Sequence, residues 1–452
     1  MRSIHPLLKW IQNIPLGDGI RYGCAFLMVC FFVSYAWTLS DGAVARAATI
    51  WMRVFSYQEY NTWPKIWQYL RELRTGVPPI LSFLELWSFK AKGSLNLIAG
   101  GLYRVSLVGM LTLPLFLTRL RWIDLGIWSV SAWLLLHALL VVHFGNPQLY
   151  DVCLPFFLLL FLVTLRGSWQ KQVPRWLGGI LAAMSGFWLA MAELARPFML
   201  ALVPILIGYA AWQFWEKGVF RRIWILLIPV LLLSGGWHLK LLIYNNGQVI
   251  WSNHGGTNLF RAWVSLVDQE AMRAQLQPEA PPISDNDWAW TNINTQVHAE
   301  NSAVRSAAVK KGILAQPGAA WKLFWQKVEH FIEPQTDMYD YHPRTPAIPW
   351  YIKWVNWTYY VLAILLVYRG IRGFWRPVRW LKPGFMYLFI AFFLSFLPII
   401  GEAGEEARFL VAVVPFLMLV LHEGGHTLTK GLIWLRKLIF PPPSVPLAPA
   451  AN

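Results

Sequence analysis

Charged residues are scarce in this chain of 452 residues. Asp, Glu, Lys and Arg together make up 14% of it and hydrophobic residues make up 56%, whereas soluble globular proteins carry roughly 25% charged residues. Cysteine is also scarce, and none of Cys24, Cys30 and Cys153 is placed for a disulfide or a metal-thiolate cluster, because all three lie inside apolar runs. The composition excludes an ordinary soluble domain and predicts a polytopic membrane protein.

Two further features are missing from the sequence: a nucleic-acid-binding motif and a signal-peptide cleavage pattern. The net charge is +16, yet no nucleic-acid-binding motif accompanies it and the basic residues alternate with apolar runs, so we expect no nucleic-acid partner. The amino terminus lacks a short apolar core followed by a small-residue cleavage site. The apolar run at 22–40 is therefore expected to be a retained span rather than a removed signal peptide.

Apolar runs close to the length of a helical span predict an all-α fold with about ten transmembrane helices. The runs fall at 21–40, 96–118, 124–143, 150–165, 176–192, 197–215, 222–237, 350–368, 384–400 and 408–422. The segment 80–89 contains Glu85 and has about half of the needed length, so it is expected to be an interfacial helix.

The distribution of basic residues predicts the topology. Connections such as 166–175, 217–222 and 369–382 are rich in Lys and Arg, whereas the alternate short connections contain almost none. Because short cytoplasmic loops carry the excess of Lys and Arg, we expect both termini inside and a multi-pass protein of the plasma (inner) membrane.

This topology divides the chain into four parts. The N-terminal transmembrane domain is 1–236 and includes a first outer loop, 41–95. The segment 237–349 is a small extracytoplasmic module, with helix-like pieces at 302–316 and 319–332. The C-terminal transmembrane helices occupy 350–438, and the Pro-rich tail 439–452 is expected to be disordered.

Polar residues that are far apart in the sequence share the predicted outer face. A solvated loop charge or a helix cap is the commoner explanation for any one of them, but such a gathering at a membrane boundary also indicates a polar cavity. These residues are Asp41, Glu59, 146–151, Glu193, Arg196, His238, Lys240, Asn253, His254, Glu402, Glu405, Glu406 and Arg408. Asp41, directly behind the first span, fits two roles: a cap of the following helix or a catalytic base.

The order of these parts resembles the GT-C class of membrane glycosyltransferases, the group of the protein O-mannosyltransferases and aminoarabinose transferases. Asp41 follows the first span, and an aromatic-rich loop leads to the Pro-Pro of TGVPPILSFLELW. An Arg-Pro ends a middle span in ELARPFMLALVP, and GEAGEEARFLVAVVP places acids, Arg and Pro at the last span. The resemblance covers most of the chain through several diffuse motifs.

The resemblance implies transfer of a sugar from a polyprenyl-phosphate donor to a lipid, glycan or protein acceptor at the outer membrane face. Asp41 then corresponds to the first-loop acid, and Arg196 and Arg408 to residues that hold the lipid phosphate. Relatives often have a second acid or a tyrosine after the first acid, whereas Gly42 follows here, so Glu59 is a rival catalytic residue. The other residues expected to bind substrate are Lys240, Asn253, His254 and Glu405.

No cofactor is assigned from the sequence. Some relatives bind a divalent metal, for which Asn253, His254 and the glutamates at 402–406 offer ligands, but no spacing requires one. The segment SNHGGTN is either a substrate-facing loop or an ordinary tight turn.

Two other functions compete with glycosyl transfer. His422, Glu423 and His426 lie in HEGGH, the HExxH pattern of zinc proteases. Its adjacent glycines weaken the helix that must align the ligands, and no third ligand is evident, so a chance match is the simpler interpretation. A transporter is the other alternative, but the long outer loops and uncharged span centres disfavour it.

Overall fold

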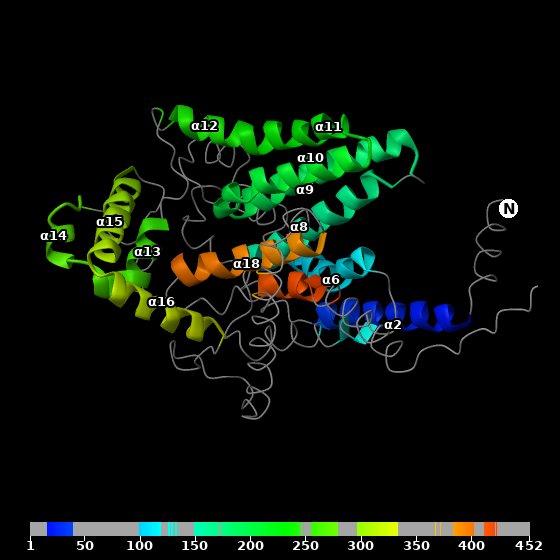
Figure 1. Ribbon diagram of the computed structural model, residues 1–452, viewed down its shortest axis with the longest axis horizontal. Helices are drawn as coiled ribbons and strands as arrows, with labels where there is room; N and C mark the ends of the chain where they lie inside the picture. Colours follow the sequence, from blue (N-terminus) through cyan, green and yellow to red (C-terminus); the bar gives the residue numbers. More distant parts are fainter. Residues whose placement is uncertain are drawn as a thin grey trace, which may run out of the picture.

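The computed structural model describes residues 16–38, 99–118, 149–170, 173–244, 255–278, 296–332, 383–401 and 411–420, with single positions at 125, 126, 128, 129, 132, 247, 367, 371 and 422. Within these ranges every regular element is a helix. A bundle of long helices continues at one end into a smaller helical module, which carries α13 to α16 (Figure 1).

Six described helical segments are long and apolar enough to cross a membrane. They are Ile20–Trp37 in α2, Gly100–Leu117 in α6, Asp151–Ser168 in α8, Arg175–Ala195 (α9), Arg222–Ile243 and Pro383–Gly401 (α18). The chain is therefore an all-α membrane protein in the part that the structure describes. The expected number of about ten spans, with both termini inside, stays a prediction.

Two predicted spans differ in detail. The run 197–215 is interrupted: Arg196 is extended, Pro197–Ala201 forms a 3-10 helix (η3), and α10 (Val203–Glu216) follows. Pro197 explains why α9 ends before it, since a proline ring disfavours helical geometry at the preceding residue, here Arg196. The run 222–237 instead continues to Tyr244, as α11 (Arg222–Val230), a π-helical turn at Leu231–Gly235 (η4) and α12 (Gly236–Tyr244).

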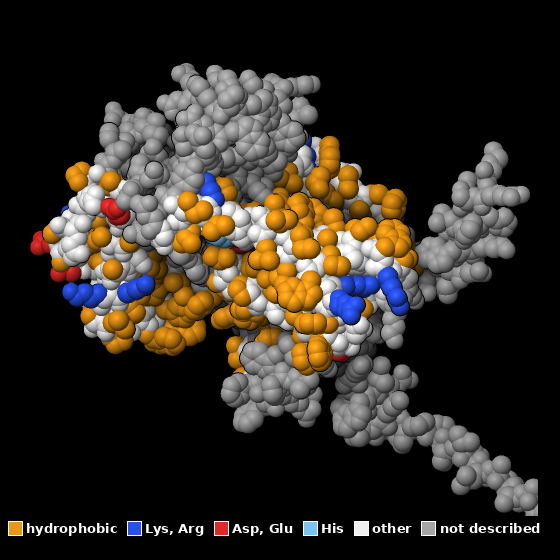
Figure 2. All heavy atoms as spheres, turned by 90° about the horizontal axis from the view of Figure 1, so that it is seen from above, with side chains coloured by type: hydrophobic (Ala, Val, Ile, Leu, Met, Phe, Trp, Pro, Cys, Tyr) orange, Lys and Arg blue, Asp and Glu red, His pale blue; other side chains and the backbone are white. Residues whose placement is uncertain are grey.

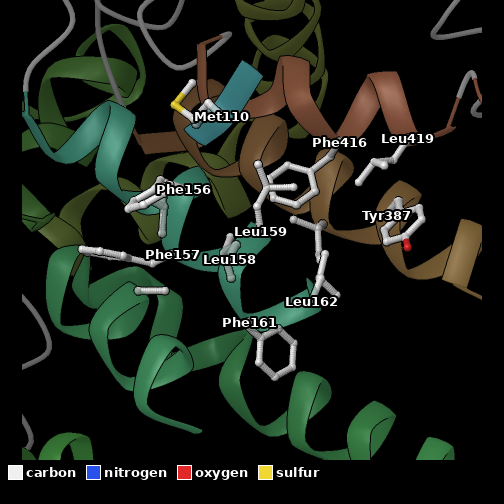
Figure 3. Packing of buried hydrophobic residues seen from close by; sticks show 14 of the residues in the cluster. Met110, Phe156, Phe157, Leu158, Leu159, Phe161, Leu162, Tyr387, Phe416 and Leu419 are labelled. Carbon is white, nitrogen blue, oxygen red and sulfur yellow. The ribbon is translucent and has the colours of Figure 1, made fainter. Parts of the chain in front are cut away.

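Helix α8 (Leu149–Ser168) forms the centre of the bundle. It packs on α6 (Ala99–Leu117) and α9, while α9 also packs on α11 and α6 contacts α2 (Leu16–Thr38). Leu159 and Leu162 of α8 lie near Phe416 of the helix Val411–Val420, and Phe161 points away from them toward other helices (Figure 3). The side chains of Leu159, Phe161 and Phe416 are fully buried, so α8 contributes to packing on several sides.

Glycine allows two of these helix pairs to approach closely. A Cβ atom added to Gly186 of α9 would lie 1.9 Å from the backbone oxygen of Leu226 in α11, and one added to Gly109 of α6 would lie 2.2 Å from the ring of Phe156 in α8. Small residues at such contacts are typical of membrane helix packing, because van der Waals contact between backbones drives the association.

Arginine side chains cap helix carbonyls at one end of the bundle. Arg166 donates to the carbonyl of Leu117, the last residue of α6, and Arg222 donates to the carbonyl of Ser168, the last residue of α8. The final carbonyls of a helix lack intrahelical donors, and cations there also interact favourably with the helix dipole. The described basic residues at 166–175 and 217–222 follow or precede these helix ends.

The opposite end carries the helical module. It consists of α13 (Gly255–Trp263), a 3-10 turn at Val264–Leu266 (η5), α14 (Gln269–Arg273), α15 (Gln296–Ala315) and α16 (Pro317–Ile332). The pieces expected at 302–316 and 319–332 correspond to α15 and α16. Their small core includes Trp263, Leu266, Met272 and Val309.

The surface of the bundle matches a membrane environment. In Figure 2, hydrophobic side chains cover most of the described face of the bundle, and Lys and Arg side chains gather at the end away from the module and on the module itself. Exposed apolar residues such as Phe26, Trp224, Leu232 and Phe392 contribute to this surface. Contiguous apolar surface of this kind indicates contact with lipid.

Candidate functional site

Two ion pairs lie at the module end of the bundle. Nη2 of Arg196, directly behind α9, lies 2.6 Å from Oδ1 of Asp151 in the first turn of α8. Oε1 of Glu193 in α9 lies 2.6 Å from Nε2 of His238 in α12. Because α8 and α9 are antiparallel neighbours, the start of one and the end of the other meet here. We call Asp151, Glu193, Arg196 and His238 the polar cluster.

Burial within the polar cluster is unequal. The side chains of Asp151 and Glu193 are each 1% exposed, whereas those of Arg196 and His238 are 13% and 24% exposed. A buried carboxylate is stable only when it is paired, so each acid depends on its partner. In return each acid fixes the position of a guanidinium or an imidazole that reaches the surface.

Glu193 has a second notable feature. Its other oxygen, Oε2, is buried and has no hydrogen-bond partner among the described residues. A buried unsatisfied carboxylate oxygen is costly, and such atoms are rare in folded proteins. Among the described residues, the hydrogen bond to His238 is therefore the contact that stabilises this carboxylate.

Tyr103 lies on the Asp151 side of the polar cluster. Tyr103 of α6 is buried and lies within electrostatic range of Asp151, Tyr35 of α2 and Cys153. Ser106 lies one helical turn after Tyr103 in α6, and its hydroxyl is 3.4 Å from the Cys153 thiol. Helices α6, α8 and α9 thus each contribute residues beside Asp151.

A second cation lies on α12. Nζ of Lys240 is 4.4 Å from the centre of the Trp237 ring, and the Arg196 guanidinium is 5.9 Å from the Phe198 ring. Lys240 is half-buried and follows His238 by two residues. Both cations therefore rest against aromatic rings, a contact worth about 0.5 to 2 kcal/mol depending on desolvation.

The predicted site residues fall into two groups. Arg196 and Lys240 are described, and both lie at the module end of the bundle. Asp41, Glu59, Asn253, His254, Glu405 and Arg408 lie outside the described residues, as do the first outer loop 41–95, the segment 80–89 and the tail 439–452. Their roles stay predictions.

Asp151, Glu193 and His238 are among the polar residues predicted on the outer face, but none of them is among the predicted binding residues. The sequence feature that could have identified them is their place as charged or polar residues at the end of an apolar run. Tyr35 and Tyr103 carry no such signal, since a tyrosine near a membrane boundary is common.

Metal ligation has no support in the described ranges, where no group of three or more His, Cys, Asp and Glu side chains could hold a metal ion. Of the HEGGH segment only His422 is described, and it is buried next to the helix Val411–Val420. Glu423 and His426 lie outside the described residues.

The polar cluster can perform two chemical tasks. A guanidinium held by a carboxylate binds phosphate oxygens strongly and with a fixed orientation. An imidazole whose Nε2 is bonded to a carboxylate is held in one ring orientation, as a proton donor, proton acceptor or hydrogen-bonding group requires.

Comparison with known proteins adds no family. No protein-family model matches the chain, and no significant match to it was found among curated proteins or solved structures. The function must therefore be argued from the residues of the chain itself.

Proposed function

We propose that this protein is a glycosyltransferase that moves a sugar from a polyprenyl-phosphate donor to an acceptor at the module end of the helical bundle. The observation that carries the proposal is the position of Arg196, whose guanidinium is held by the buried Asp151 carboxylate at 2.6 Å and whose side chain is 13% exposed. A fixed cation at the end of a membrane bundle suits a phosphate whose prenyl chain remains in lipid.

The reaction requires three events. An acceptor hydroxyl attacks the anomeric carbon of the sugar, the bond between that carbon and the phosphate oxygen breaks, and a base takes the hydroxyl proton. Negative charge then grows on the departing polyprenyl phosphate. Arg196 stabilises that charge, because preorganised cationic donors act where charge develops in the transition state.

Lys240 and His238 extend the binding surface on α12. Lys240 supplies a second positive charge at the same end of the bundle, and His238 is held by Glu193 at 2.6 Å. Asp41 and Glu59 are the proposed bases, on the sequence resemblance alone. A bundle end that gathers cations and fixed polar groups at the lipid boundary is the arrangement that a lipid-linked donor requires.

Substitution of Arg196 tests the proposed phosphate site. The purified protein in lipid nanodiscs is given a labelled polyprenyl-phosphate sugar, and transfer is measured for Arg196→Lys and Arg196→Ala. We expect transfer to fall by about 10²- to 10³-fold in Arg196→Ala, the effect of removing one transition-state donor. Arg196→Lys keeps the charge but loses the planar guanidinium geometry, so it retains more activity than Arg196→Ala.

The matched control is Arg175→Ala, which removes an exposed arginine from the opposite end of α9. It should transfer sugar at the wild-type rate. Thermal unfolding of each variant separates loss of activity from loss of fold. If folded Arg196→Ala transfers sugar as fast as Arg175→Ala, the proposed phosphate site is wrong. If Asp41→Asn and Glu59→Gln both keep full activity, the proposed bases are wrong.

A further inference from the structure

A continuous row of aromatic rings connects α18 with α16. The ring of Phe392 stacks on that of Phe396 at 5.4 Å, and Phe396 meets Phe324 of α16 edge to face at 6.2 Å. The Phe324 ring in turn contacts Trp321 at 5.9 Å and Trp325 at 5.7 Å. Figure 1 shows α16 beside α18, and the two helices are in contact.

Both ends of this row are exposed. Phe392 is 55% exposed on a helix that is apolar enough to cross a membrane, so its outward face contacts lipid. Trp321 and Trp325 are 62% and 51% exposed, and they lie one helical turn apart on α16. The exposed face of α16 is therefore continuous with the lipid-facing surface of α18.

The end of α18 sets the depth of the row. The Trp263 indole nitrogen of α13 donates to the carbonyl of Ile400 at 2.7 Å, next to the last residue of the helix. Phe396 precedes Ile400 by one helical turn, or about 6 Å along α18. Taking the end of this span at Gly401 as the level of the membrane surface puts Phe396 in the zone between headgroups and acyl chains, into which the apolar face of an interfacial helix is buried by about 5 to 10 Å.

The residues of α16 fit this zone. Tryptophan is enriched at the membrane–water boundary, because its ring is apolar while its N–H needs a polar partner. Lys322 lies exposed next to Trp321, and a Lys side chain can place its ammonium among headgroup phosphates.

We propose that the face of α16 formed by Trp321 and Trp325 binds the lipid headgroup region of the membrane leaflet on the module side. This contact attaches the module to the bilayer and fixes its height above the polar cluster. The inference is independent of glycosyl transfer, because it uses none of the residues of the proposed reaction.

The test places an environment-sensitive fluorophore at position 321 of the full chain. Trp321→Cys is made with Cys24, Cys30 and Cys153 replaced by serine, and the labelled protein is placed in nanodiscs of phosphatidylethanolamine and phosphatidylglycerol. The matched control is Gln275→Cys, an exposed position behind α14 in the same module. Nitroxide lipids then quench the label from either a shallow or a deep acyl position.

We expect a blue-shifted emission at position 321 and a loss of fluorescence with the shallow nitroxide that exceeds the loss at position 275. Equal quenching at the two positions would overturn the proposal. If no lipid quenches the label at 321, and unlabelled Trp321→Cys protein forms a disulfide between two copies, the proposal is also overturned, in favour of a dimer contact. Trp325→Cys repeats the measurement at the neighbouring turn, so a misfolded Trp321 variant does not end the test.

Discussion

At the scale of single residues, the side chains of the polar cluster differ in burial. Asp151 and Glu193 are sealed from the surface, whereas their partners Arg196 and His238 reach it. The acids therefore hold their partners in place, and under the proposed function the guanidinium and the imidazole are the groups that would meet a ligand. This difference in burial predicts that replacing the buried acid and replacing its more exposed partner change stability by different amounts.

The pair of Glu193 and His238 provides such a comparison. His238→Ala leaves a buried carboxylate without its partner, so we expect it to lower the free energy of unfolding by about 3 to 5 kcal/mol. Glu193→Gln removes the charge but keeps a hydrogen-bonding group of the same shape, so it should cost only about 1 to 2 kcal/mol. Unfolding in detergent micelles, followed by circular dichroism, measures both.

The double variant is the control for this pair. In Glu193→Gln with His238→Ala no buried charge is left behind, so the double variant should be more stable than the sum of the two single effects implies. Simple additivity, or a larger cost for Glu193→Gln than for His238→Ala, would contradict the assignment of Glu193 as a buried carboxylate that depends on His238.

At the scale of helices, hydropathy predicts most of the described bundle. Each of the runs 21–40, 96–118, 150–165, 176–192 and 384–400 corresponds to a helix, because the apolar length needed to cross a bilayer is a property of the local sequence. The π turn at Leu231–Gly235 has no comparable signal, since it lies inside a uniformly apolar run. It changes the helical register before His238 and so affects the direction in which that side chain points.

The position of the polar cluster at one end of the bundle could be predicted from the sequence, but the contacts within the cluster could not. Charge counting predicts that Glu193, Arg196 and His238 share one face, and they lie at one end of the bundle. Which side chains pair depends on the rotation of each helix about its axis, which hydropathy does not encode. Asp151 could not be identified as the partner of Arg196 from sequence, because 45 residues separate them.

Helix packing leads to a prediction at Gly186. A methyl group there would approach the Leu226 backbone oxygen to 1.9 Å, so α9 and α11 must move apart in Gly186→Ala. We expect a loss of about 1 to 3 kcal/mol in the free energy of unfolding, the usual cost of overpacking. The thermal unfolding midpoint in detergent micelles measures it.

Gly208→Ala is the matched control. Gly208 also lies inside a helix, α10, but an added Cβ atom would meet nothing within 4 Å. Alanine costs less conformational entropy than glycine in a helix, so this variant should gain about 0.5 to 1 kcal/mol. Equal shifts in the two variants would show that the close approach of α9 to α11 does not limit stability.

At the scale of the whole molecule, the two ends of the bundle differ in construction. One end uses Arg166 and Arg222 to cap helix carbonyls, and the other brings together the polar cluster and the module. Phe324 belongs to the packing of both the bundle and the module. The module is thus attached to the bundle through α18, by a ring contact at Phe396 and a hydrogen bond at Ile400.

This attachment predicts the behaviour of Trp263→Phe. Phenylalanine keeps much of the apolar contact of the buried Trp263 ring but loses the N–H that donates to the Ile400 carbonyl. Loss of one hydrogen bond costs about 1 kcal/mol, which corresponds to an approximately fivefold rise in the open population of the module. Limited trypsin cleavage at the exposed Lys310 and Lys311 of α15 measures this open population. The measurement holds when the module closes again faster than trypsin cuts it.

The bundle itself should be unaffected, so its thermal unfolding midpoint is expected to stay at the wild-type value while cleavage of the module accelerates. Trp321→Phe serves as the control, because the Trp321 ring is 62% exposed and no described hydrogen bond involves its indole nitrogen. Trypsin should cut that variant, in detergent, at the wild-type rate. Unchanged cleavage of Trp263→Phe would mean that ring packing alone holds the module on α18, since the hydrogen bond would then contribute nothing measurable to the attachment.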